Sequence, residues 1–120
     1  MKQQLIISLD ELLQDDWNEI KHYRLTSQQF DVLLSHPKLD WEECHFPAGE
    51  KYREMRNEKD ELALVISGSI IHEIEGRAYE QRRGELIIIP ADIIHSAEIG
   101  AEEDCIAYAY YKNKTAITGI

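Results

Sequence analysis

The stretch Gly84-Glu85-Leu86-Ile87-Ile88-Ile89-Pro90-Ala91-Asp92-Ile93-Ile94-His95 decides the fold of this chain. Its apolar run, residues 86–89, stands between Arg83-Gly84 and Pro90-Ala91-Asp92, where Gly, Pro and Asp set or permit turn geometry. An apolar run of this length between turns is typical of a buried β-strand. It is far shorter than the roughly 20 residues that a membrane-spanning helix needs.

The same alternation of short β segments and turns continues from about Phe30 nearly to the end of the chain. The segments that we expect to be strands are residues 30–34, 41–46, 62–67, 69–74, 78–81, 86–89, 95–99 and 105–112. Every turn between them contains Gly or Pro, and no helical pattern intervenes. Strands at roughly ten-residue spacing without connecting helices predict an all-β, antiparallel sandwich or barrel.

The first 25 residues have a different pattern. Ser8 and Glu11 have the spacing of a capping box, and Leu9, Leu12, Leu13 and Trp17 recur at helical spacing. We expect a short N-terminal helix that packs on the main body, because so short a helix is not stable alone. The predicted organisation is a helical extension over residues 1–25 and one β-barrel domain over residues 26–120.

The charge balance excludes several classes of partner. Thirteen Lys and Arg residues stand against 23 Asp and Glu residues, a net charge of −10. The one basic pair of note, Arg82-Arg83, is flanked by Glu80 and Glu85, so binding to nucleic acid or an anionic membrane is not expected. The N-terminus lacks the apolar region of a secretory signal, which predicts a cytoplasmic location. Cys44 and Cys105 lack metal or redox spacing and are expected to be buried thiols.

The spacing of the turn residues resembles the cupin superfamily, whose small barrels carry two motifs. The first motif runs Gly, five residues, His, one residue, His, three or four residues, Glu, six residues, Gly. The matching positions here are Gly49, Met55, Asn57, Glu61 and Gly68, so the spacing is kept while both histidines are replaced.

The second motif runs Gly, five residues, Pro, one residue, Gly, two residues, His. Here it is Gly84, Pro90, Asp92 and His95, with Asp92 in place of the second Gly. The resemblance covers about residues 46–100 and implies a small single-domain cupin, an antiparallel jelly-roll β-barrel. It also implies a homodimer.

In cupins, the two histidines and the glutamate of the first motif and the histidine of the second usually bind one divalent metal. The resemblance therefore implies a ligand pocket at Met55, Asn57, Glu61 and His95, in which only Glu61 and His95 are ordinary metal ligands. Replacing two imidazoles by a thioether and a carboxamide removes donors suited to zinc, iron or nickel. A divalent transition metal, if bound, is expected to be held weakly.

Three interpretations of Glu61 and His95 stay open at this point. They form a weak metal site, a hydrogen-bonded pair without function, or part of a metal-free pocket that touches a small ligand or transfers protons. His72 shares a strand face with Ile70 and Ile74, and His45 ends the strand before the first motif; either could supplement the site.

Other residues have simpler interpretations. His22 and His36 are expected at the surface, because their neighbours are polar. Strand alternation places Tyr108 and Tyr110 on one face and Tyr111 on the other.

The leading hypothesis is a small cupin-domain protein that binds a small molecule in its barrel with a degenerate metal site. One alternative is an enzyme, either a metal-dependent oxygenase or isomerase that uses Glu61 and His95 or a metal-free isomerase or epimerase. Another alternative is a ligand-sensing regulatory module.

Overall fold

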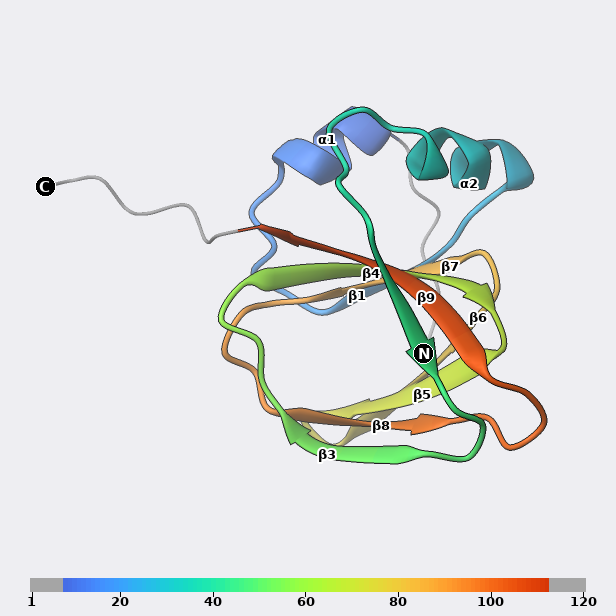
Figure 1. The fold of residues 1–120 in the computed structure, drawn as a ribbon. Coiled ribbons are helices and arrows are strands. Elements are labelled where there is room, and N and C mark those ends of the chain that lie inside the picture. The colour runs from blue at the N-terminus through green and yellow to red at the C-terminus, as the bar shows by residue number, and fades with distance from the viewer. Residues whose placement is uncertain (1–7, 113–120) are drawn as a thin grey trace, which may run out of the picture.

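A computed structural model describes residues 8–112 of the chain. Two short helices precede and flank a pair of antiparallel sheets (Figure 1). In chain order the elements are α1 (Leu9–Gln14), β1 (Lys21–Arg24), α2 (Ser27–Leu34), β2 (Glu42–Phe46), β3 (Lys51–Met55), β4 (Asp60–Ser67), β5 (Ser69–Ile74), β6 (Arg77–Arg82), β7 (Glu85–Ile89), β8 (His95–Ile99) and β9 (Cys105–Lys112). None of the helices in this part of the chain is long and apolar enough to cross a membrane.

The strands form two layers. The first sheet has the order β1-β7-β4-β9-β2 and the second the order β3-β8-β5-β6, with every pair antiparallel. Sequential strands alternate between the layers from β2 to β5 and again from β6 to β9, as in a jelly roll. The predicted all-β, cupin-like barrel with a short N-terminal helix is confirmed.

The N-terminal helix begins where the capping pattern predicts. The Ser8 hydroxyl accepts a hydrogen bond from the Glu11 backbone N–H at 3.3 Å, and α1 runs from Leu9 to Gln14. The chain then turns, and β1 pairs with β7 at the edge of the first sheet. A strand therefore lies within the stretch that we expected to form only a helical extension.

The predicted strand at residues 30–34 is wrong, because these residues belong to α2. The Thr26 hydroxyl accepts from the Gln29 N–H at 3.1 Å, and the Gln29 side-chain oxygen accepts from the Thr26 N–H at 2.9 Å. This capping box starts the helix, and Phe30, Leu33 and Leu34 then share the face that packs on the sheet. The strand β3 was also not expected. Its two apolar residues, Tyr52 and Met55, are three positions apart and do not alternate, because the register shifts between them and Glu54 has a positive φ.

The largest hydrophobic cluster of the described residues lies outside the barrel, between the helices and the outer face of the first sheet (Figure 1). We call this cluster the helix-side core. It consists of Leu12, Trp17, Tyr23, Leu33, Leu39, Leu62, Leu64, Leu86 and Ile88. Alternation along β4 then sends Glu61, Ala63 and Val65 to the opposite face, toward the second sheet. The helices thus seal one face of the sheet, and the other face lines the barrel interior.

Two turn positions explain the motif spacing. At Gly68, φ is +77°, and a Cβ atom there would lie 2.5 Å from the Asp104 backbone oxygen, so only glycine fits. At Asp92, φ is +66°, a left-handed conformation that aspartate tolerates better than most residues. Asp92 can therefore occupy the position at which the second motif has its second glycine.

Candidate functional site

The two motifs meet at one end of the barrel, where the β3–β4 and β7–β8 loops lie side by side (Figure 1). The Asp92 N–H donates to the Asn57 backbone oxygen at 2.8 Å, and the Ala91 N–H donates to the buried Asp60 carboxylate at 2.8 Å. Met55 of β3 is the register partner of His95 of β8. We call this region the Glu61 end of the barrel, lined by Met55, Asn57, Glu61, His95 and Tyr111.

Glu61 is held in place by Asn57. The Asn57 Nδ2 group donates to Glu61 Oε1 at 2.6 Å. The Glu61 side chain keeps some accessible surface, yet protein atoms surround its carboxyl group, and this desolvation raises the pKa of Glu61 to about 7. The Asn57 hydrogen bond opposes that shift without cancelling it.

Tyr111 and Cys44 face the same end of the interior. Tyr111 is the register partner of Glu61, and Cys44 lies on β2, beyond β9. Burial is the main cause of a raised pKa at both the Tyr111 hydroxyl and the Cys44 thiol, and the Glu61 charge adds to it. Both groups are therefore neutral near pH 7 and can donate hydrogen bonds. Tyr108 and Tyr110 lie on the opposite face, as alternation predicts, and Tyr110 packs edge-on against Trp17.

His95 faces the interior with one ring nitrogen engaged. Its Nδ1 lies 3.0 Å from the Ile93 backbone oxygen, an acceptor, so Nδ1 carries the proton of this bond. In the neutral ring Nε2 is then an acceptor. The hydrogen bonds of these two side chains go to Asn57 and to the Ile93 oxygen, and no hydrogen bond or ion pair joins Glu61 to His95.

A second set of polar side chains lies deeper in the interior, and the sequence did not indicate that they come together. This set consists of His22, His72, Gln81 and Glu85. His22 was expected at the surface but is buried, because β1 belongs to the sheet; its Nε2 lies 3.0 Å from Glu85 Oε1. His72 is also buried, and its Nε2 lies 3.0 Å from Gln81 Oε1. Desolvation lowers the pKa of His72 to about 4, which keeps the ring neutral. Of these features, the sequence indicated only that His72 shares a strand face with Ile70 and Ile74. It gave no indication of the partners of His72 or His22.

The remaining histidines lie away from the interior. His45 is exposed on β2 and its Nε2 lies 2.9 Å from Glu43 Oε2. His36 is half-buried beside the helices, with Nε2 4.0 Å from Asp10 Oδ1. Neither supplements the Glu61 end. Cys105 is buried and Cys44 half-buried, and both are free thiols.

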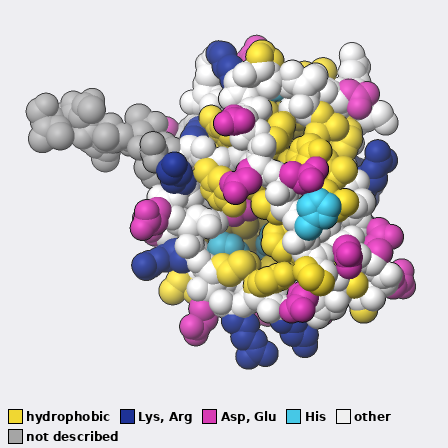
Figure 2. Space-filling view, in the orientation of Figure 1, with side chains coloured by type: hydrophobic (Ala, Val, Ile, Leu, Met, Phe, Trp, Pro, Cys, Tyr) yellow, Lys and Arg dark blue, Asp and Glu magenta, His cyan; other side chains and the backbone are white. Residues whose placement is uncertain are grey.

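The barrel interior is buried in its middle and partly open to solvent at its rim. In the middle, Val65, Ile74 and Ile87 have no exposed surface, like Leu62 and Leu64 of the helix-side core. Around the opening of the barrel, interior-facing side chains from four strands all keep part of their surface accessible: Cys44, Phe46, Tyr52, Met55, Glu61 and Tyr111. The space-filling view shows hydrophobic, acidic and histidine side chains gathered over this hollowed side (Figure 2).

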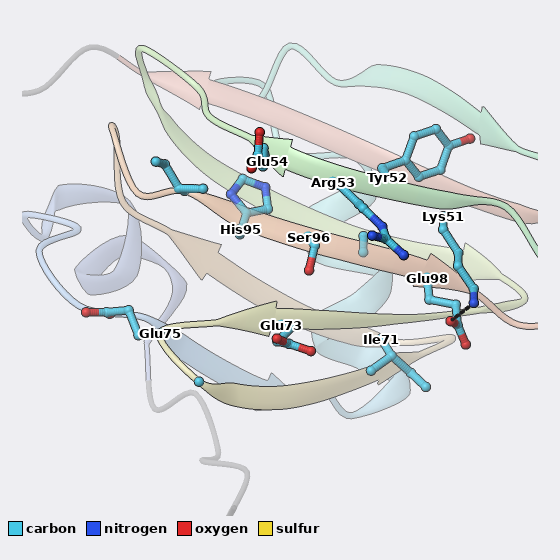
Figure 3. Close-up of a pocket in the computed structure, with 13 residues that line it drawn as sticks. Lys51, Tyr52, Arg53, Glu54, Ile71, Glu73, Glu75, His95, Ser96 and Glu98 are labelled. Carbon is cyan, nitrogen blue, oxygen red and sulfur yellow. Dashed lines mark ion pairs between the residues drawn. The ribbon is translucent and has the colours of Figure 1, made fainter.

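A separate groove of about 570 Å³ lies on the outer face of the second sheet. Figure 3 shows Arg53, Glu73 and Ser96 at this face, together with the Lys51–Glu98 ion pair, whose Nζ and Oε1 atoms are 3.4 Å apart. The groove also exposes Ile71 and Ile94. It shares His95 with the Glu61 end of the barrel but does not include Met55, Asn57, Glu61 or Tyr111.

The residues at the Glu61 end do not fit a strongly bound transition metal. Asn57 directs its Nδ2 group at Glu61, and Met55 packs against the apolar cluster of Val65 and Ile99. Within residues 8–112, no group of three or more His, Cys, Asp or Glu side chains is arranged to hold an ion. Two ordinary donors without a third make a weak site at most.

Comparisons with known proteins agree with this architecture. Solved structures with the same fold include a DUF861 family protein from Thermotoga maritima, with a TM-score of 0.60 and 17% identity over 78% of this chain and 100% of that one. A cupin superfamily protein from Desulfitobacterium hafniense has a TM-score of 0.53 and 16% identity over 94% and 95% of the two chains. KdgF from a Halomonas species has a TM-score of 0.54 and 17% identity over 79% and 80%.

A search of curated proteins found no match. The sequence family that does match is the Cupin domain, over residues 42–111, which is more than half of the chain and runs from β2 to β9. That range contains both motifs and the whole Glu61 end of the barrel. The chain therefore belongs to the cupin domain family.

Proposed function

We propose that this protein binds a small molecule inside its barrel, at the Glu61 end, and that binding does not depend on a four-ligand metal centre. The observation that carries the proposal is the accessible surface that interior-facing side chains keep around the opening of the barrel, although the middle of the interior is buried. A concave, mostly apolar space with a few polar groups is the usual form of a small-molecule site.

The polar groups at this end suit recognition of a ligand. Asn57 orients the Glu61 carboxyl, and the neutral Tyr111 hydroxyl lies on the neighbouring strand. Met55 contributes apolar surface, in keeping with its packing against the interior cluster. We expect any divalent transition metal at Glu61 and His95 to bind weakly, because Met55 and Asn57 replace the two imidazoles.

A metal-free isomerase or epimerase is the second candidate. The observation that favours it is the geometry of Glu61, an oriented carboxyl in a partly desolvated site with His95 at the same end of the barrel. Its pKa of about 7 fits this role, because a general acid or base works best when its pKa is near the working pH.

We extend the proposal to the location, oligomeric state and partners of the protein. We propose a cytoplasmic homodimer that binds neither nucleic acid nor membranes. The net charge of −10 supports the exclusion of polyanionic partners. The exposed side chains of Ile71 and Ile94 on the outer face of the second sheet support a contact between barrels.

The test combines metal content with a ligand screen. Wild-type protein purified without a metal-binding tag should carry less than about a tenth of an equivalent of transition metal by elemental mass spectrometry, before and after incubation with Zn²⁺, Ni²⁺, Mn²⁺ or Cu⁺. A thermal-shift screen of metabolites should then find a stabilising ligand, since a ligand at 100 times its Kd adds about 2.7 kcal/mol.

The variant Glu61→Gln serves as the matched probe, because it keeps the shape of the side chain and removes its charge. Loss of the thermal shift in Glu61→Gln, with Glu43→Gln on the exposed face of β2 behaving as wild type, places the ligand at the Glu61 end. Near one equivalent of metal that disappears in Glu61→Gln/His95→Gln would instead establish a metal centre and overturn the proposal.

A further inference from the structure

The orientation of the buried Gln81 side-chain amide determines which ring nitrogen of His72 carries the proton. The Gln81 Nε2 group donates to two backbone carbonyl oxygens, those of Ala63 and Glu85, at 2.8 Å each. Carbonyl oxygens only accept, so this amide cannot be turned the other way. Its Oε1 atom therefore faces His72 Nε2 at 3.0 Å, and His72 Nε2 must carry a proton to make that bond.

The other ring nitrogen of His72 is consequently an acceptor. His72 is 4% exposed, and its Nδ1 has no hydrogen-bond partner within the described residues. A neutral ring with a proton on Nε2 has a bare lone pair on Nδ1. Leaving such an acceptor buried and unpaired lowers the free energy of unfolding by about 1–3 kcal/mol. A buried acceptor of this kind in a folded protein therefore calls for an explanation.

The surroundings of His72 are rich in acceptors. His95 lies on the neighbouring strand β8, where it is the register partner of Ile74. Ile74 follows His72 by two residues on β5 and faces the interior as His72 does. The Nε2 of His95 is bare in the neutral ring, since Nδ1 bonds to the Ile93 oxygen. Glu61, at the same end as His95, has one oxygen bonded to Asn57 and offers its other oxygen as a further acceptor.

Few cations are placed to balance an anion bound beside His72. On β1, Arg24 lies on the same face as His22, but its Nε is 3.8 Å from Glu85 Oε2 and its side chain is largely exposed. Lys51 and Arg53 of β3 line the groove on the outer face, and Lys112 of β9 donates to backbone oxygens of Leu13 and Asp15 beside α1. Among residues 8–112, the strands β3, β4, β5, β8 and β9 turn no lysine or arginine toward the interior. The interior faces of these same strands carry small buried side chains at Ala63, Ala97 and Ala109.

We infer that His72 is a ligand-recognition residue, whose Nδ1 accepts a hydrogen bond from a hydroxyl or ammonium group of the molecule bound in the barrel. The inference rests on the proposed small-molecule function. It narrows the chemistry of the ligand to molecules with an O–H or N–H group that can donate a hydrogen bond. Carboxylates and phosphates are excluded as the group that meets His72, because they offer only acceptors near neutral pH and would meet acceptors without a countercharge.

The test compares three probes on one carbon frame: propane-1,3-diol, propane-1,3-diamine and malonate. The reporter is the ¹⁵N chemical shift of His72 Nδ1 in ¹⁵N-histidine-labelled wild-type protein, since this shift moves when the lone pair accepts a hydrogen bond. We expect the diol or the diamine to move it in a saturable way and malonate to leave it unchanged. The diol and diamine arms distinguish a hydroxyl ligand from an ammonium ligand.

Two variants separate recognition from structure. His72→Gln can place an amide N–H near the position of Nε2, which keeps the bond to Gln81 and removes the acceptor at Nδ1. His72→Asn can place its amide near Nδ1 and loses the bond to Gln81. We expect His72→Gln to bind the active probe about tenfold more weakly with its thermal stability retained, and His72→Asn to keep more of the affinity while losing stability.

Several results would overturn the inference. They are a malonate response at His72 equal to that of the other probes, unchanged affinity in His72→Gln, or an Nδ1 shift that already indicates a hydrogen bond in buffer and responds to no probe. Binding that perturbs Glu61 and spares His72 would refute this inference and leave the proposed function standing. If no probe and no screened metabolite perturbs any interior residue, the proposed function fails as well.

Discussion

Glu61 and His72 are two buried titratable side chains whose effects on stability run in opposite directions with pH. The folded pKa of Glu61 is raised to about 7 from 4.5, so the folded state binds more protons than the unfolded chain between these values. Stability from this group is present below about pH 4.5 and is lost as the pH rises to 7. The folded pKa of His72 is lowered to about 4 from 6.5, so its contribution is present above pH 6.5 and is lost as the pH falls to 4.

The first prediction isolates the Glu61 contribution. Because glutamine does not titrate, the stability of Glu61→Gln relative to wild type should rise by about 1–3 kcal/mol between pH 4.5 and pH 7 and then level off. Urea unfolding of both proteins at several pH values measures the difference. A difference that stays flat with pH would contradict the raised pKa of Glu61, and the exposed Glu43→Gln serves as the control.

The second prediction concerns Asp92, the residue that replaces a motif glycine. Its positive φ of 66° disfavours side chains branched at Cβ, so Asp92→Val should destabilise the fold by roughly 1–2 kcal/mol. Asp92→Gly should lie within about 0.5 kcal/mol of wild type, since relief of the backbone strain is offset by greater freedom of the unfolded chain. Chemical denaturation tests both variants, and equal losses in the two would show that the Asp92 side chain, not its backbone conformation, matters.

At the scale of elements, α1 and α2 act as covers for the first sheet. Each begins with a capping hydrogen bond and carries apolar residues that join the helix-side core. These helices bury the outer face of the first sheet, and Leu33 of α2 has no exposed surface. A separate set of buried side chains, among them Ile74 and Ile87, fills the middle of the barrel, so the partly accessible interior side chains are those around its opening.

The third prediction compares these two faces. Leu33→Ala, in the helix-side core, should cost about 2–5 kcal/mol, because Leu33 has no exposed surface and its removal leaves a cavity. Met55→Ala, in the partly open interior, should cost roughly 1 kcal/mol or less, since water can reach the site. Thermal and urea denaturation give both values. Comparable losses would mean that the interior is packed as tightly as the helix-side core.

At the scale of the whole molecule, charge and exposed apolar surface suggest where contacts form. The net charge of −10 repels polyanions, which is why we propose no nucleic-acid partner, while the outer face of the second sheet presents Ile71 and Ile94 within a groove. Exposed isoleucines grouped at a concave surface are typical of an interface. The opposite outer face, on the first sheet, is already covered by the two helices.

The fourth prediction follows for the oligomeric state. We expect wild-type protein to sediment as a dimer, and Ile71→Glu to shift it toward monomer by placing a charge in the contact. The exposed Val32 on α2 provides the control, because Val32→Glu alters the helix side and should leave the dimer intact. Analytical ultracentrifugation over a range of concentrations measures both, and a monomeric wild type would contradict the proposed homodimer.

The sequence by itself determined the succession of turns and strands from residue 41 onward except for β3, the start of α1, and the positions of Glu61 and His95 in the motifs. These features follow from local chemistry: Gly and Pro at turns, apolar alternation, and a capping hydroxyl. The helix over residues 30–34 also has a local signal, the Thr26–Gln29 capping box, which our strand prediction did not use. The tertiary structure alone decided that His22 is buried and that His72 Nδ1 has no hydrogen-bond partner within the described residues. The physical reason is distance along the chain, since His22 bonds to Glu85 63 residues away, and no local pattern specifies which far segment a side chain meets.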